Sequence, residues 1–190
     1  AEVNITGTTR LLDAMQSAGV RRLVFGSSSS VYGNQPSVPF REIDPVDRPI
    51  SPYAATKRAG ELLCHTWHHL HGLSVACLRF FTVYGPRQRP DLAIAKFIER
   101  IDQGQPLPVF GDGSSSRDYT YVADIVDGIA RALDWTGARE PRFGIVNLGN
   151  STPVALSALV ATIAAALDRQ AILQHLPDRK STRLNSSHVA

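Results

Sequence analysis

Short apolar runs alternate with amphipathic stretches along most of this chain, and this alternation predicts strands and helices in turn. Residues 22–26 are apolar after the first position and end in glycine, which is typical of a short buried strand. Residues 74–81 are rich in β-branched and aromatic side chains and predict a second strand. Two further short strands are expected at Leu107–Phe110 and Phe143–Leu148.

Apolar residues at helical spacing separate these runs. Gly19 provides a stop for the first helix, and Pro52 and Pro153 suit the first turn of a helix, where a missing N–H costs nothing. Helices are expected over residues 3–18, 53–71, 91–101, 124–133 and 154–167. Residues 34–52, which contain five prolines, are expected to form a loop, and residues 111–116 a polar turn. The fold class is therefore α/β.

Hydroxyl, phenol and ammonium groups are expected to converge at one end of this fold. The serine run that starts at Ser27 and Ser28 follows the first strand, and ligand crevices in open α/β sheets lie beyond the carboxyl ends of strands. Tyr53 and Lys57 lie at i and i+4 of one helix, so they share a face. A nearby ammonium favours the phenolate, so Tyr53 could remove a proton from an alcohol. The simpler interpretation is an ordinary surface pair.

The serine run SSSSVYG, followed 25 residues after Ser28 by YAATK, resembles the extended short-chain dehydrogenase/reductases, and within them the nucleotide-sugar 4-epimerases. The resemblance implies the second half of a Rossmann-like parallel sheet over residues 1–85. It also implies part of a small α/β substrate domain, with returning Rossmann segments, over residues 86–177. Residues 178–190 do not match and are expected to be a non-native or disordered tail.

The resemblance implies NAD as cofactor and a UDP-sugar as substrate. Ser28, Tyr53 and Lys57 would be catalytic: Tyr53 takes the 4-hydroxyl proton as hydride leaves, Lys57 supports the phenolate, and Ser28 holds the oxygen. The implied cofactor contacts are Asn4, Ser27, Tyr53, Lys57 and Phe81. The alternatives are a plain polar residue in a helical first turn for Asn4 and a core position for Phe81.

Substrate contacts are implied for Ser28 and for residues of the second half. Thr82 and Arg89 match positions that hold the C6 carboxylate in UDP-glucuronate 4-epimerases. Val109 and Phe110 match positions beside the uridine, and Arg117 matches a diphosphate ligand. Two alternatives stay open: Arg89 binds only phosphate or solvent, or the substrate is UDP-glucose.

Related dehydratases and decarboxylases carry a glutamate just before the VYG, where this chain has serine, so an epimerase is favoured over them. A catalytically inactive dinucleotide-binding scaffold is the alternative outside enzymes. No GxxGxxG turn occurs in the 190 residues. We therefore expect an N-terminally truncated fragment of such an enzyme that is inactive by itself and binds NAD poorly.

Composition limits the class of protein, its location and its partners. The hydrophobic content of 43% and charged content of 19% are typical of a globular protein, and no apolar run reaches the roughly 18 residues of a membrane span. Cys64 and Cys77 lack metal or redox spacing and indicate reduced thiols in the cytoplasm. The pI of about 9.1 comes without a basic, aromatic-rich stripe, so nucleic acid is not an expected partner.

Four histidines lie on the helix at residues 53–71, but no carboxylate or cysteine joins them in a set of metal ligands, so no metal site is expected there. They are His65, His68, His69 and His71. The resemblance instead implies a homodimer, formed through this helix and the helix that begins at Val3.

Overall fold

A computed structural model of the protein describes residues 1–111 and 115–177, and it divides the chain into two compact units. The first unit consists of residues 1–81 and 123–149, and the second of residues 82–122 and 150 onward. The expected tail at 178–190 and the centre of the expected turn at 111–116 lie outside the described residues.

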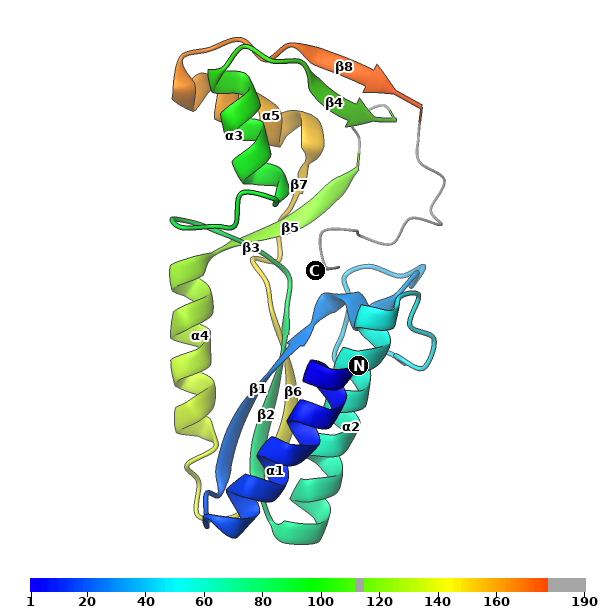
Figure 1. Ribbon diagram of the computed structural model, residues 1–190, viewed down its shortest axis with the longest axis vertical. Helices are drawn as coiled ribbons and strands as arrows, with labels where there is room; N and C mark the ends of the chain where they lie inside the picture. The colour runs from blue at the N-terminus through cyan, green and yellow to red at the C-terminus, as the bar shows by residue number, and fades with distance from the viewer. Residues whose placement is uncertain (112–114, 178–190) are drawn as a thin grey trace. The chain divides into compact units, whose positions relative to one another are not determined.

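The first unit is built on a parallel sheet with the strand order β1-β2-β6 (Figure 1). Its strands are β1 (Arg22–Ser28), β2 (Ser74–Phe80) and β6 (Phe143–Leu148). The expected strands are present, and this parallel α/β architecture confirms the predicted fold class. However, β1 continues two residues past Gly26, so Ser27 and Ser28 belong to the strand and not to the loop after it.

Three helices cover the sheet. Figure 1 shows α1 (Gly7–Ser17) and α2 (Pro52–His71) on one side and α4 (Val122–Trp135) on the other. A π-helical turn, η1 (Glu2–Thr6), precedes α1. The Ser51 hydroxyl caps α2 by accepting from the Ala54 N–H, and Pro52 occupies its first turn.

The core of the first unit lies between the sheet and the helices α1 and α2. Its buried members come from both helices, from β2 and from the residue before it: Leu12, Met15, Cys64, Leu73, Val75 and Cys77. Gly60 of α2 allows a close approach to β1, because a Cβ there would lie 2.3 Å from the Phe25 ring.

Within its described residues, the second unit contains two helices and two small sheets. Its helices, α3 (Ala93–Asp102) and α5 (Leu156–Leu167), pack together around Ile101, Leu107, Val160 and Ile163. One sheet has the order β3-β5-β7, and the other pairs β4 with β8. The strands are β3 (Thr82–Tyr84), β4 (Leu107–Phe110), β5 (Ser116–Tyr121), β7 (Pro153–Ala155) and β8 (Leu173–Leu176).

The expected helix at 154–167 was wrong at its start. Pro153–Ala155 form β7, which pairs antiparallel with β5, and the helix begins at Leu156. A proline at the first residue of an edge strand leaves no ladder hydrogen bond unmade. The strands β3, β5 and β8 were also not predicted, because they are specified by pairing with partners distant in sequence. Among the described residues, no helix has the length and apolarity to cross a bilayer.

Candidate active site

The candidate serine lies where β1 ends. Ser28 caps the 3-10 turn η2 (Ser29–Tyr32): its hydroxyl accepts from the Ser30 N–H at 3.2 Å and lies 2.9 Å from the Ser30 hydroxyl. Ser28 is buried, with 5% of its surface exposed. Its side chain is therefore fixed at the carboxyl edge of the sheet.

Tyr53 and Lys57 lie on α2 beside this edge. The Lys57 ammonium donates to the Gly26 carbonyl at 2.9 Å, and it lies 5.8 Å from the centre of the Tyr53 ring. Burial lowers the pKa of Lys57 below its ordinary value. The ammonium thus links α2 to β1 two residues before Ser28. Its positive charge is close enough to the Tyr53 ring to interact with it electrostatically.

Asn4 and Thr56 tie the start of the chain to the same helix. The Asn4 side-chain amide donates to the Thr56 hydroxyl at 3.0 Å, and that hydroxyl donates to the Tyr53 carbonyl at 2.8 Å. The link spans 52 residues and reaches the helical turn that holds Tyr53 and Lys57. In this structure Asn4 therefore supports the position of α2.

Ser27 and Phe81, both expected at the cofactor, have their side chains in other contacts. The Ser27 hydroxyl donates to Glu61 at 2.6 Å, in the interior of the unit. The Phe81 ring is partly buried and lies 6.4 Å from the Phe40 ring. Both residues nevertheless lie at the carboxyl ends of the strands, Ser27 in β1 and Phe81 directly after β2.

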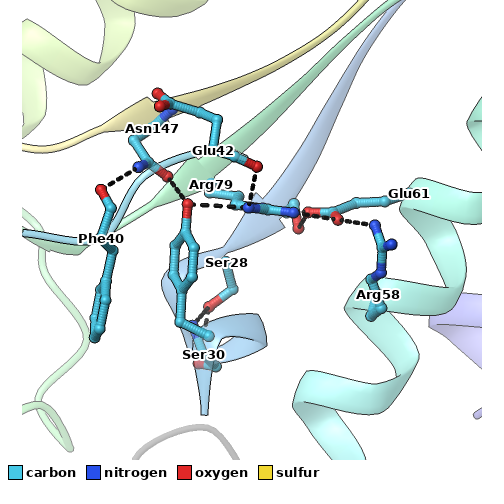
Figure 2. A network of polar contacts seen from close by, with 10 residues as sticks. Ser28, Ser30, Phe40, Glu42, Arg58, Glu61, Arg79 and Asn147 are labelled. Atoms are coloured by element: carbon cyan, nitrogen blue, oxygen red, sulfur yellow. Dashed lines mark hydrogen bonds and ion pairs between the residues drawn. The ribbon is translucent and has the colours of Figure 1, made fainter. Parts of the chain in front are cut away.

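A buried polar network lies directly behind the serine edge, as Figure 2 shows. The Arg79 guanidinium forks onto the Glu61 carboxylate with two bonds of 2.9 Å, and both side chains are at most 1% exposed. Arg58 donates to Glu61 at 2.9 Å. Arg79 also donates to the Tyr32 hydroxyl, which donates to Asn147 at 2.7 Å.

Charge pairing decides the ionisation of this network. Burial by itself raises the pKa of Glu61, but hydrogen bonds from Arg79 and Ser27 outweigh it, so this pKa lies below its ordinary value. Burial likewise opposes the charge of Arg79, and the bond to Glu61 outweighs it and raises the pKa of Arg79. Burial raises the pKa of Tyr32 despite the neighbouring Arg79. The network therefore holds an ion pair and a neutral phenol at neutral pH.

Sequence reasoning missed this network, although one signal was present. Arg79 is the single charged residue in a buried, mostly apolar strand, and a buried charge requires a partner. Glu61 lies four residues after Lys57 and so shares its helix face. These two observations together point to the pair. The roles of Tyr32 and Asn147 carry no comparable local signal.

The other expected site residues belong to the second unit. Thr82 lies in β3 opposite Tyr119, and Arg117 lies in β5 opposite Val154. Arg89 forms an ion pair with Asp91 at 3.4 Å, with both side chains more than half exposed.

Val109 and Phe110 form the end of β4, opposite His175 and Leu176 of β8. The Val109 side chain is buried, at 3% exposure, so a ligand could meet this residue at its backbone, and Phe110 is partly exposed.

The residues of the first unit suit one end of a dinucleotide. A phenol and an ammonium one helical turn apart lie beside the carboxyl edge of a parallel sheet, where such folds bind ligands. The described site thus fits the reacting end of a nicotinamide cofactor, and the sequence holds no glycine-rich turn for the pyrophosphate.

A parallel sheet with a serine, a tyrosine and a lysine at its carboxyl edge defines a Rossmann-like protein of the dehydrogenase/reductase type. Residues 1–149 match the model of the NAD dependent epimerase/dehydratase family. The chain belongs to this family.

Curated relatives and solved structures agree with this assignment. A UDP-glucuronate 4-epimerase of Thermodesulfobacterium geofontis is 42% identical over 179 residues, which cover 94% of this chain and 54% of that protein. A UDP-N-acetylglucosamine 4-epimerase of Methanobrevibacter ruminantium M1, in complex with UDP-N-acetylmuramic acid, superposes with a TM-score of 0.87 at 31% identity. The match covers 94% of this chain and 57% of that one.

A UDP-glucuronic acid 4-epimerase of Bacillus cereus, in complex with UDP-glucuronic acid and NAD, superposes with a TM-score of 0.81 at 34% identity. The match covers 92% of this chain and 55% of that one. The chain thus spans about half the length of the relatives that it matches.

Proposed function

We propose that this chain is part of an NAD-dependent nucleotide-sugar 4-epimerase that inverts C4 of a UDP-hexose, with UDP-glucuronate as the favoured substrate. The observation that carries the proposal is the Lys57 ammonium, which donates to the Gly26 carbonyl near the end of β1 and faces the Tyr53 ring. Relatives described as UDP-glucuronate 4-epimerases support the substrate class.

In this mechanism the three residues of the first unit divide the work. NAD, when bound, supplies a reversible hydride acceptor. Tyr53, as the phenolate, removes the proton of the sugar 4-hydroxyl and becomes a neutral phenol, and the nearby Lys57 ammonium stabilises the phenolate before it takes up that proton. Ser28, fixed by its bonds to Ser30, donates to the same oxygen as it becomes a carbonyl. Tyr53 returns the proton after the 4-keto sugar has presented its other face.

The preference for an acid sugar rests on Thr82 and Arg89. A guanidinium forks onto a carboxylate, and a hydroxyl can donate to the same oxygens. The exposed pair of Arg89 with Asp91 is weak enough to exchange for a substrate carboxylate. A charged hydrogen bond contributes about 1.5–3 kcal/mol, which corresponds to a preference of about ten- to a hundred-fold over the neutral hexose. UDP-glucose is the second candidate substrate.

The test of the catalytic assignment is Tyr53→Phe in a full-length enzyme that contains this segment. The variant should fold like the parent and lose turnover by about 10² to 10⁴-fold, since general-base contributions have that size. Epimerisation is followed by separating the two UDP-hexoses after reaction. Turnover within a few-fold of the parent would remove Tyr53 from the mechanism.

The test of the substrate is the ratio of kcat/KM for UDP-glucuronate over UDP-glucose, with Arg89→Ala beside the parent. We expect the parent to prefer the acid and the variant to lose most of that preference. If UDP-glucose is the better substrate and Arg89→Ala leaves the ratio unchanged, the carboxylate assignment is wrong and a UDP-glucose epimerase remains.

Further parts of the proposal concern assembly and location. Leu11 of α1 and Leu62 and Leu70 of α2 are each at least half exposed, which supports a homodimer through these helices. Cys64 and Cys77 are buried free thiols, which supports a location in the reducing cytoplasm.

A further inference from the structure

The three strands of the first unit carry a row of polar side chains one residue before their candidate catalytic edge. Ser27 of β1 is the register partner of Arg79 in β2, and Arg79 is the partner of Asn147 in β6. Paired residues of neighbouring strands project to the same face of a sheet. The row therefore runs across the sheet directly behind Ser28.

One end of the row is anchored to the helix that carries Tyr53 and Lys57. Glu61 accepts from Ser27 at 2.6 Å and from Arg79 at two positions, both at 2.9 Å. Glu61 follows Lys57 by one helical turn on the same face of α2. The carboxylate thus fixes the distance between the end of β1 and the helical turn that holds the catalytic pair.

The other anchor is Tyr32, the last residue of the turn η2 that Ser28 caps. Its hydroxyl accepts from Arg79 at 2.9 Å and donates to Asn147 at 2.7 Å. Its ring stacks on Phe40 at 4.7 Å between centres and lies 4.8 Å from the Arg79 guanidinium carbon. Tyr32 is 3% exposed, so these contacts are shielded from water.

We propose that Tyr32 is a positioning residue for the reaction: together with Arg79 and Glu61 it clamps the segment that bears Ser28 from both sides. On one side of Ser28, Ser27 is held to α2 through Glu61. On the other side, Tyr32 at the end of η2 is held to the sheet through Arg79 and Asn147. Both anchors meet at one guanidinium, so Ser28 keeps a fixed place relative to Tyr53. This inference rests on the proposed epimerase function.

The test is Tyr32→Phe in the full-length enzyme, because phenylalanine keeps the stacked ring and removes the hydroxyl alone. A misplacement of about 1 Å can lower a rate by about 100-fold. We expect kcat to fall about ten- to a hundred-fold with KM within about twofold of the parent, and the deuterium isotope effect on kcat to rise with substrate deuterated at C4. Loss of folded enzyme would lower kcat but leave the isotope effect unchanged.

Thr136→Val provides a matched control in the same unit. Thr136 directly follows α4 and is 1% exposed, and its hydroxyl donates to the Leu133 carbonyl at 2.6 Å. The variant also loses one partly buried hydrogen bond, but it lies near the opposite end of the sheet, because the next residue, Gly137, lies beside the Arg22 side chain at the start of β1. It should lower the thermal midpoint and leave kcat and the isotope effect unchanged.

Two further variants separate the outcomes. If Tyr53→Phe is inactive while Tyr32→Phe keeps the parent kcat and isotope effect, the positioning role is overturned and the proposed function stands. If Tyr53→Phe is active, the proposed function itself fails. Should Tyr32→Phe not fold, Asn147→Ser removes the acceptor of the Tyr32 hydroxyl; it should raise the isotope effect with a several-fold loss of kcat, and an unchanged isotope effect there overturns the role.

Discussion

Replacement of Arg79 by methionine tests how the first unit depends on its buried ion pair. The change leaves the Glu61 carboxylate at 0% exposure with two remaining donors, Ser27 and Arg58. Arg58 is 29% exposed, so water screens its contribution. Arg79→Met also removes the donor to the Tyr32 hydroxyl.

Breaking a buried pair from one side costs about 3–5 kcal/mol, because one charge is left without compensation. Arg58 and Ser27 still hold Glu61, so we expect a loss near the lower end, about 3 kcal/mol. With a urea dependence of about 1–3 kcal/mol per molar, the unfolding midpoint should fall by about 1–3 M. Fluorescence of Trp67 and Trp135, both in the first unit, follows its unfolding.

The double variant Glu61→Leu with Arg79→Met decides whether charge is the cause. Removing both charges relieves the unpaired carboxylate, so the double variant should be more stable than Arg79→Met alone. If the two single losses simply add in the double variant, the pair is not coupled and the reasoning from buried charge is refuted. Arg131→Met, which breaks an exposed pair with Asp127, is the surface control and should change stability by less than about 1 kcal/mol.

Three further predictions concern the same unit. The folded pKa of Glu61 lies below its unfolded value of about 4.3. The stability that ionised Glu61 contributes is therefore present above that pH and is lost as pH falls through the folded pKa. Glu61→Gln should flatten the loss of stability between about pH 5 and 2, measured by urea titration at each pH. Gly60→Ala should destabilise by about 1–3 kcal/mol in thermal unfolding, because its Cβ would overlap the Phe25 ring, and Phe25→Leu should recover part of that loss. Cys64 and Cys77 are fully buried, and the pKa of Cys77 is raised chiefly by its hydrogen-bonding neighbour Cys64 and by burial. Both thiols should therefore resist alkylation until the protein unfolds. Fast labelling under native conditions would contradict this.

Local patterns were sufficient for the elements that carry the candidate site. The apolar run that ends in glycine located β1, and Pro52 located the start of α2, because both signals lie within a few residues. Spacing alone put Tyr53 and Lys57 on one face of this helix, and the structure shows the ammonium near the phenol ring. The site roles of these residues stay predictions.

Interactions between distant residues explain what the sequence could not show. Residues 153–155 look like the start of a helix until β5 is available to pair with them across more than thirty residues. Asn147 and Tyr32 meet over 115 positions, and no local pattern specifies that contact. The hydroxyl of Ser27 could equally face a ligand or the interior, and Glu61 directs it inward.

The polar row across the sheet also has a consequence for strand alignment during folding. Residues 74–79 of β2 are all buried, so apolar contacts alone distinguish poorly between the native pairing and a slip by two residues. Such a slip would place Phe25, in place of Ser27, beside Arg79 and would separate the guanidinium from its ordered partners. A single charged residue thus raises the free energy of the misaligned sheet, because its buried charge would lack its partners. Arg79 therefore favours the native register over other pairings that are similarly apolar.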